Sequence, residues 1–251
     1  MGKEVYHYTS LEVLKKILLS KTLRFTKLNS LNDISEYKFG LQLLKDKVSD
    51  FEKSNKIINK IDLNLFDRFS FLNSLYSLSF TECGDSISFW NSHYVDKNNP
   101  ISLCLVSDRI FNNNNFIINR CIYGDPYPVM GKERYQWFRD IFETKNILKL
   151  YKNREYTQIT FQTAHIKHKA FEIEKEWRAI SFVSKDSSAG KFSRNGKEVE
   201  YFDQHFNIDS IREIIIGPCR NQKANYEEVL SFISENNIKC FVTKSMIPLE
   251  L

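Results

Sequence analysis

The stretch FEIEKEWRAISFV, residues 171–183, passes from charged to apolar within a few positions. Its first half places carboxylates at Glu172, Glu174 and Glu176, and its second half has the aromatic and β-branched residues of a buried strand. Carboxylates avoid burial unless they are paired or used in chemistry. The stretch therefore indicates either a solvated approach to a strand or a catalytic glutamate at the mouth of a pocket.

An extended backbone would gather the charges of this stretch on one side. Side chains alternate along a strand, so Glu174, Glu176 and Arg178 would share one face, with Trp177 on the other. A guanidinium beside two carboxylates keeps one of them ionised. If the ion pair is exposed and purely structural, it contributes little to stability. The spacing thus fits either a structural ion pair or a charged site.

Strands and helices at irregular spacing are expected on both sides of this stretch. Thr9 and Glu12 have the spacing of a capping box, so a helix is expected from about Ser10. The apolar run ISLCLVS indicates a strand that is buried on both faces. The expected strands cover residues 4–9, 22–26, 74–81, 101–107, 178–184, 199–203, 212–218 and 238–244, and the expected helices start near 10, 34 and 86 or cover 132–150, 157–168 and 224–236. This order predicts one α+β domain over residues 1–251, with a helical insertion at about 45–75, because the strands are spaced too irregularly for a doubly wound sheet.

Composition limits the class of protein. The 251 residues are 42% apolar and include 20 Phe and 12 Tyr, which can fill a large core. No run of about 18 apolar residues occurs, and the first residues lack the apolar stretch of a secretory signal, so neither a membrane helix nor export is expected. Five Cys without paired spacing predict neither a disulfide framework nor a zinc site. A reducing cytoplasm is the expected location.

The charge and the familiar motifs leave the chemistry open. The net charge of +5 permits an acidic partner such as nucleic acid, although an excess of Lys for solubility is the more common explanation. Glycine-rich phosphate loops, the HExxH motif and the GxSxG motif do not occur. His165 and His168 are spaced to share a helix face, but without a third ligand nearby no metal site is expected.

Three further features attract attention, although each has a structural explanation when taken alone. His7 lies between two Tyr on the first expected strand, where a histidine is usually a satisfied structural residue. Arg24 and Phe25 occupy the next strand, with Asn32 and Asp33 just beyond it, and taken alone they indicate an edge charge and a helix cap. Trp90 and Tyr94 lie four residues apart with His93 between them, so they share one face of a helix, where core packing is the default.

Taken in order, these features resemble a bacterial family of domains of unknown function. The hallmarks are YHYTS (6–10), LRFTKLNSLNDISEY (23–37), SLSFTE (77–82), SISFWNSHY (86–94), KAFEIEKEWR (169–178) and IREIIIGP (211–218). They cover nearly the whole chain, and the ordered set is more specific than any one motif. This family in turn resembles the ADP-ribosyltransferase superfamily. The resemblance implies a split β-sandwich, in which two small, mostly antiparallel sheets surround an NAD cleft, with flanking and inserted helices.

The resemblance also implies roles for the two glutamates of the opening stretch. Cleavage of the nicotinamide–ribose bond builds an oxocarbenium-like cation. Glu176 would stabilise that charge and hold the ribose 2′-hydroxyl, which is electrostatic stabilisation of a developing charge. Glu174 would orient the acceptor nucleophile. NAD would be the substrate, and no metal would be required.

The remaining residues would bind NAD. His7 would hydrogen-bond the adenosine ribose, and Arg24 would pair with the pyrophosphate. An aromatic side chain would stack on the nicotinamide ring, and the sequence leaves this role open between four candidates. These candidates are Phe25, Tyr37, Trp90 and Tyr94, and Tyr8, Thr9 and Arg178 complete the expected binding set.

The function expected from the resemblance is ADP-ribosylation of a macromolecule by a toxin or anti-phage effector. Nucleic acid, as RNA or single-stranded DNA, is placed ahead of protein as the acceptor, and a neutralising antitoxin is expected as a partner. Tyr123, Tyr127 and Trp137 would stack unpaired bases or belong to the core. Two alternatives remain open, a module that senses a nucleotide without turnover and an NAD glycohydrolase with water as the acceptor.

Overall fold

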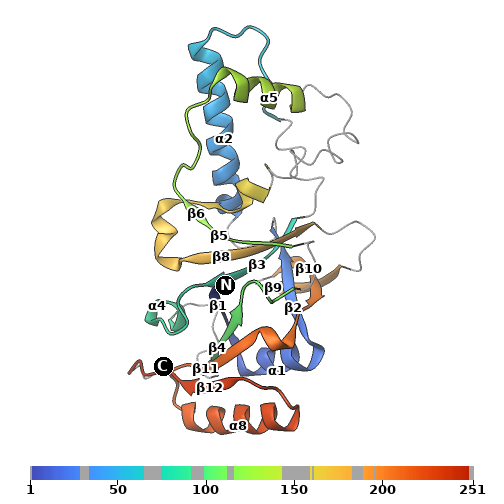
Figure 1. The fold of residues 1–251 in the computed structure, drawn as a ribbon, viewed down its shortest axis with the longest axis vertical. Helices are drawn as coiled ribbons and strands as arrows, with labels where there is room; N and C mark the ends of the chain where they lie inside the picture. The colour runs from blue at the N-terminus through green and yellow to red at the C-terminus, as the bar shows by residue number, and fades with distance from the viewer. Residues whose placement is uncertain are drawn as a thin grey trace.

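The computed structural model describes residues 2–28, 34–64, 75–91, 99–111, 116–142, 159, 161–182, 189–194 and 196–248 (Figure 1). Within these residues the chain is a mixed α+β fold with one large, mostly antiparallel sheet, which confirms the predicted class. Helix α2 (Ile34–Ser54) begins before the helical insertion expected at about 45–75, and residues 65–74 of that insertion lie outside the described part. No helix in the described part of the chain is long and apolar enough to span a membrane.

The large sheet contains ten strands along a branched path. Its order is β12 (Phe241–Lys244), β11 (Ile211–Ile216), β4 (Pro100–Val106), β1 (Glu4–Ser10), β3 (Leu75–Thr81), β2 (Thr22–Lys27), β10 (Lys197–His205) and β9 (Gly190–Arg194), and β8 (Glu176–Phe182) adds to β3 and carries β5 (Phe116–Arg120). All of its ladders are antiparallel except that between β11 and β12. Strands β6 (Ile122–Tyr123) and β7 (Ile166–Lys167) form a separate parallel pair.

Strands β1 and β2 diverge from the same edge of β3. Tyr6 of β1 pairs with Thr81, and Thr26 of β2 pairs with Ser77. Continuing either ladder would bring β1 or β2 opposite Ser79, yet neither ladder includes Ser79. We call this point, at Ser79, the fork. The two sheets expected from the sequence are therefore the two arms of one sheet, because β3 holds both β1 and β2 on one edge and β8 on the other.

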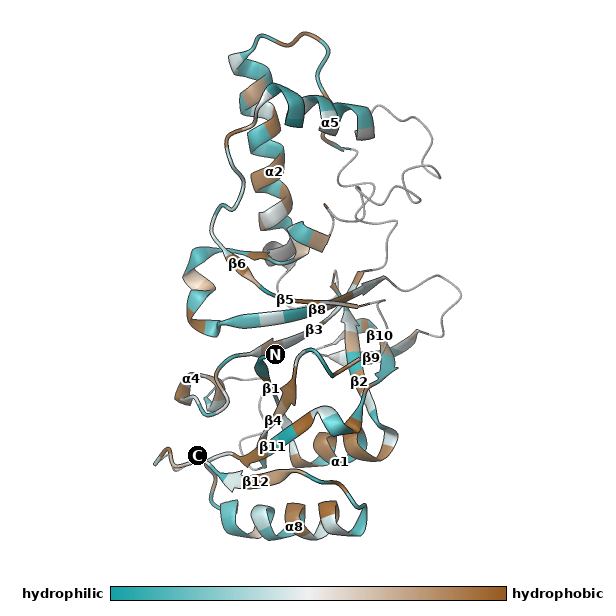
Figure 2. Ribbon diagram, viewed as in Figure 1, coloured by the Kyte–Doolittle hydropathy of each residue, from teal (hydrophilic) through white to brown (hydrophobic). Residues whose placement is uncertain are grey.

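The main core lies between the sheet and α1 (Leu11–Ser20), with α8 (Gln222–Glu235) beside it. Leu14 and Leu18 of α1 are buried at helical spacing, and β4 is buried along most of its length, as its apolar run predicts. Figure 2 shows β4 as mostly hydrophobic. The N-cap of α1 is Ser10, whose side chain accepts a hydrogen bond from the backbone of Val13, rather than the predicted Thr9.

A second, smaller core lies between α2 and α5 (Lys132–Phe142), at the opposite end of the molecule from α1 and α8 (Figure 1). Leu44, Val48 and Phe138 are buried in it. Tyr127 and Trp137 pack against it as partly buried residues, so two of the aromatics considered for base stacking belong at least partly to this core.

Candidate functional site

The residues around Glu176 hold the densest group of buried charges in the described chain. Strand β8 begins at Glu176 and follows the short 3-10 helix η2 (Lys169–Glu174). Lys175 joins them in the left-handed region with φ 42°, and its carbonyl accepts a hydrogen bond from the backbone of Glu82. Glu174 therefore ends a helix, which corrects the expected strand alternation of Glu174, Glu176 and Arg178.

Glu176 is buried and receives four hydrogen bonds. Its Oε1 accepts from Ser79 Oγ at 2.6 Å and from Arg178 Nε at 2.9 Å. Its Oε2 accepts from Lys167 Nζ at 2.6 Å and from Arg178 Nη2 at 2.9 Å. The side chain of Glu176 is only 6% exposed. The carboxylate is thus held on both oxygens by donors from β3, β7 and β8.

The two cations decide the protonation state of Glu176. Burial raises the pKa of this carboxyl, but the attraction of Arg178 and Lys167 outweighs burial and holds the pKa at about 2. The group is therefore ionised at neutral pH, in agreement with the expectation that Arg178 keeps one carboxylate charged.

Lys167 links this buried carboxylate to a more open one. Its ammonium is 3% exposed and bonds to Glu176 and also to Oε2 of Glu174, whose side chain is 35% exposed. The same ammonium lies 5.1 Å from the centre of the Phe171 ring. One buried cation therefore holds two carboxylates that differ in their access to solvent.

Contacts with Ala164 and His165 hold Arg178 in place. Its Nη1 donates to the carbonyl of Ala164 at 2.8 Å, and its own carbonyl lies 3.0 Å from Nε2 of the buried His165. The other ring nitrogen of His165 lies 2.7 Å from the carbonyl of Phe161. Burial lowers the pKa of His165, against the opposing effect of these two carbonyls. His165 is therefore a structural link between the helical segment at 161–164 and β8.

The spacing of His165 and His168 does not translate into a shared helix face. His168 caps η2 through its Nδ1, while the helix expected over 157–168 gives way to β7 after His165. No group of three or more His, Cys, Asp or Glu among the described residues is arranged to hold a metal ion.

His7 meets the same site at the fork. Its Nδ1 lies 3.1 Å from the carbonyl of Ser79, and its ring packs edge-on against Phe80. Burial lowers the pKa of His7, so the ring is neutral at pH 7 and Nδ1 donates this bond. Ser79 is exposed and contacts His7 through its carbonyl and Glu176 through its hydroxyl. The structure thus brings together His7, Ser79 and Glu176 from three strands.

Two of the aromatic candidates for nicotinamide stacking are wrong. Phe25 is 0% exposed and stacks on Phe202 in the main core. Trp90 is also 0% exposed, and its Nε1 donates to Asp85 at 2.6 Å. Neither ring has a face open to a ligand, because core residues cover both. Tyr94 and the side chain of Tyr37 lie outside the described part of the chain.

Tyr8 and Thr9 have structural contacts in the described chain. The hydroxyl of Tyr8 donates to the carbonyl of Cys83 at 2.8 Å, and its ring stacks on Phe89 at 4.8 Å. Thr9 is buried in β1 at 7% exposure. Tyr8 therefore anchors the segment after β3, next to the fork.

Arg24 is engaged on the other side of the fork. Its Nε and Nη2 each donate to a carboxylate oxygen of Asp203 at 2.8 Å, and its guanidinium lies 3.6 Å from the centre of the Tyr201 ring. Asp203 raises the pKa of Arg24, so the guanidinium stays charged. The side chain is 48% exposed, yet the contacts recorded for it are with β9 and β10 rather than with Glu176. The structure does not bring Arg24 to the carboxylates.

The sequence interpretation missed Ser79 and Lys167. Ser79 left a weak signal, since Ser77, Ser79 and Thr81 are small polar residues at alternate positions of an otherwise apolar strand. Lys167 gave no signal in the sequence, because a strand of two residues is too short to show alternation and the surrounding sequence favours a helix.

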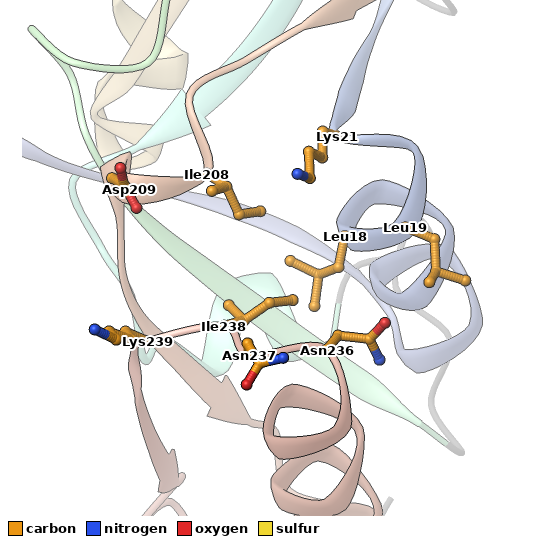
Figure 3. Close-up of a pocket in the computed structure, with 9 residues that line it drawn as sticks. All are labelled: Leu18, Leu19, Lys21, Ile208, Asp209, Asn236, Asn237, Ile238 and Lys239. Carbon is orange, nitrogen blue, oxygen red and sulfur yellow. The ribbon is translucent and has the colours of Figure 1, made fainter.

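A pocket of about 420 Å³ lies elsewhere, between the C-terminal ends of α1 and α8 (Figure 3). It is lined by Leu18, Leu19, Lys21, Ile208, Asp209, Asn236, Asn237, Ile238 and Lys239. In Figure 3 Leu18, Ile208 and Ile238 lie at its centre, with polar side chains around them. None of the residues around Glu176 lines it, so this pocket and the charged site do not coincide.

Comparisons with known proteins give a likeness in structure and none in sequence. No protein-family model matches the chain, and no curated protein matches it. Among solved structures, the chain is similar to Thermus sp. 2.9 DarT in complex with ADP-ribosylated ssDNA, with 12% sequence identity and a TM-score of 0.35. The alignment covers 97% of this chain and 94% of that chain. At this identity and TM-score, the likeness says nothing about the chemistry of the present chain.

Proposed function

We propose that the chain is an NAD-dependent ADP-ribosyltransferase that modifies nucleic acid, with Glu176 and Glu174 as its two working carboxylates. The observation that carries the proposal is their arrangement at the start of β8. One carboxylate is buried and ionised, the other is partly exposed, and both contact the same ammonium beside an exposed serine at the fork. The ordered sequence motifs, which resemble the ADP-ribosyltransferase superfamily, supply the reaction class.

The reaction needs a fixed negative charge and a proton acceptor. The bond between C1′ of the ribose and the nicotinamide nitrogen breaks, and its electron pair leaves with nicotinamide. A lone pair of the acceptor forms the new bond to C1′, and the proton of the acceptor passes to a base. Positive charge that develops on the ribose is stabilised by a carboxylate held nearby, and removing one such group costs roughly 100- to 1000-fold in rate.

The environments of the two carboxylates support a division of these roles between them. Glu176 is too acidic to take a proton, since its pKa is about 2, so it supplies the fixed charge. Ser79 is exposed and bonded to Glu176, and it is the point at which a ribose hydroxyl would approach that carboxylate. Glu174 is 35% exposed and therefore accessible to an acceptor, so it takes the proton.

The NAD-binding roles of His7 and Arg24 rest on their positions beside the fork. Neutral His7 uses Nδ1 on the Ser79 carbonyl and has no recorded hydrogen bond at Nε2 with any described residue. We assign Nε2 to a ribose hydroxyl. Arg24 binds the pyrophosphate only if the phosphates replace Asp203, because the guanidinium fork already holds that carboxylate.

Nucleic acid is the proposed acceptor because the chain carries a net charge of +5, and cationic proteins attract phosphate backbones. Transfer to RNA or DNA would damage the host cell. We therefore extend the proposal to a toxin or anti-phage effector that acts in the cytoplasm and is held in check by an antitoxin.

A second candidate, a module that binds a nucleotide without turnover, is favoured by the burial of Glu176. A carboxylate that is 6% exposed and receives four hydrogen bonds has the features of a structural ion pair. The third possibility, an NAD glycohydrolase, uses the same site with water at Glu174.

Incubation with NAD labelled in the adenylate separates these candidates. RNA, single-stranded DNA and lysate protein are tested in separate reactions, and released nicotinamide is measured in each. Label on one polymer that is lost with Glu176→Gln supports the transferase, whereas free ADP-ribose alone supports the glycohydrolase. NAD binding without nicotinamide release supports the binding module. Glu172→Gln is the matched control, since Glu172 is an exposed carboxylate on the same turn.

A further inference from the structure

We propose that Lys167 is a positioning residue that directs ADP-ribose to a macromolecule rather than to water, by holding Glu174 beside Glu176. This inference rests on the proposed function and adds a residue that the sequence motifs did not include. Lys167 contacts no reacting atom in this scheme. It acts through Glu174, which takes the proton of the acceptor as the acceptor's lone pair bonds to C1′ and nicotinamide leaves with the electron pair of the broken bond.

The backbone around Lys167 gives its side chain a fixed origin. Strand β7 pairs with β6, and the carbonyl of Lys167 accepts from the backbone of Gly124 at 2.9 Å. Strand β6 is in turn attached to the start of β8. The backbone of Cys121 donates to the carbonyl of Glu176 at 2.8 Å, and the hydroxyl of Tyr123 accepts from the backbone of Glu176 at 2.7 Å. The backbone that carries Lys167 is therefore hydrogen-bonded, through β6, to the first residue of β8.

The ion pair between Lys167 and Glu174 indicates what Lys167 does beyond its contact with Glu176. Burying an ammonium is unfavourable unless its charge is compensated, and Glu176 already provides one carboxylate at 2.6 Å. Glu176 is also bonded twice by Arg178, so its negative charge is compensated without Lys167, and the positive charge of Lys167 is balanced by Glu174. A lysine that served only the burial of Glu176 would not need to reach a carboxylate at the solvent boundary. The contact with Glu174 thus indicates a role for Lys167 outside the buried pair.

The side chain of Glu174 has few other constraints from its own element. Helix η2 buries none of its residues, and the neighbouring Ile173 is 72% exposed. The backbone of Glu174 is held, because its carbonyl accepts from the hydroxyl of Thr81 at 2.7 Å. The ion pair with Lys167 brings the carboxylate to the same ammonium that Glu176 contacts.

Loss of this ion pair is expected to separate cleavage of NAD from transfer. Cleavage depends on Glu176, which keeps Ser79 and Arg178 in Lys167→Met. Transfer needs Glu174 at a fixed place beside C1′, and misplacing a reacting group by roughly an ångström costs about 100-fold. Lys167→Met also removes one donor to Glu176, so nicotinamide release is expected to fall as well. The informative quantity is therefore the ratio of transferred label to released nicotinamide, which we expect to fall by about 10- to 100-fold.

The experiment measures both products in one reaction for the unaltered chain, Lys167→Met, Lys167→Arg and Glu174→Gln. Lys27→Met is the matched control, because Lys27 forms a 2.6 Å ion pair with a carboxylate that is also 35% exposed, on another part of the sheet. Lys167→Arg, which retains the charge, should recover part of the ratio. Glu174→Gln should reproduce the low ratio. The double variant Lys167→Met with Glu174→Gln should have a ratio no lower than that of either single variant, because both changes remove the same interaction.

The outcomes distinguish this inference from the proposed function. If the unaltered chain releases no nicotinamide, the proposed function is overturned. If it releases nicotinamide and Lys167→Met keeps the ratio of the unaltered chain, only the role of Lys167 is overturned. Additive losses in the double variant would also overturn it. If Lys167→Met does not fold, as judged by circular dichroism and thermal unfolding, the decision passes to Glu174→Gln, and a normal ratio in that variant refutes the inference.

Discussion

Acid titration of stability tests whether Glu176 is ionised and paired in the folded chain. Burial raises the pKa of Glu176, but the attraction of Arg178 and Lys167 lowers it from an ordinary value of 4.5 to about 2. A carboxyl whose pKa is lower in the folded than in the unfolded chain stabilises the fold above the unfolded pKa. This stabilisation is lost as the pH falls through the folded pKa. We therefore expect the chain to lose stability as the pH falls from 4.5 to about 2.

The size of the loss follows from the two pKa values. At about 1.36 kcal/mol per pH unit, a decrease from 4.5 to about 2 corresponds to roughly 3 kcal/mol. The side chain of Glu176 is 6% exposed, so water and salt screen this interaction little. Surface pairs such as Lys191 and Glu198, which are 57% and 65% exposed, are expected to contribute far less.

Urea unfolding at a series of pH values, for the unaltered chain and for Glu176→Gln, isolates this contribution. At neutral pH the variant removes the negative charge that Arg178 and Lys167 face in the interior, which is expected to cost about 3–5 kcal/mol. The difference between the two proteins should shrink as the pH falls below 4.5, because the unaltered carboxyl then becomes protonated too. A difference that stays constant down to pH 2 would refute the reasoning. Glu172→Gln should behave like the unaltered chain throughout.

Three other predictions concern the fork, a close approach of the backbone and the cell. Ser79→Ala should slow nicotinamide release by about tenfold or more, since a hydrogen bond to a charged group contributes roughly 1.5–3 kcal/mol. Ser77→Ala on the same strand should not, because the buried hydroxyl of Ser77 has no hydrogen-bond partner among the described residues. Gly84→Ala should lower the free energy of unfolding by about 1–3 kcal/mol, because its Cβ would lie 2.2 Å from the Tyr6 ring. Gly131→Ala meets open space and should change stability little. Expression in bacteria without a neighbouring gene should arrest growth and expression of Glu176→Gln should not, and equal growth of both cultures would contradict the toxin role.

Local sequence patterns were sufficient to predict most helices and strands. The apolar period of α1 and the alternation of β2 and β3 are local properties, and the structure has these elements close to the expected bounds. The change from charged to apolar residues also located β8 to within two residues, since the strand expected over 178–184 covers Glu176–Phe182. Such patterns are readable because propensity and periodicity act over a few neighbouring residues.

The aromatic candidates show where local patterns stop being informative. Phe25 and Trp90 have the chemistry of stacking residues, and in the sequence nothing separates an aromatic at a ligand from one in the core. Their burial is decided by partners that are distant in the chain, such as Phe202 for Phe25 and Ile215 for Trp90. Burial depends on which elements cover a residue, and that is a tertiary property.

The tertiary structure alone decided the site itself. Glu176 is bonded by Ser79, which is 97 positions away in the chain, and by Lys167, which lies on a strand too short to have a period. The fork arises because β1 and β2 compete for one edge of β3, and a sequence period tells which residues share a face but not which edge a strand will occupy. The charge of Glu176 can be buried because Arg178 and Lys167 both bond to its carboxylate. A buried carboxylate without these partners would be unfavourable, and only the tertiary structure brings the partners to it.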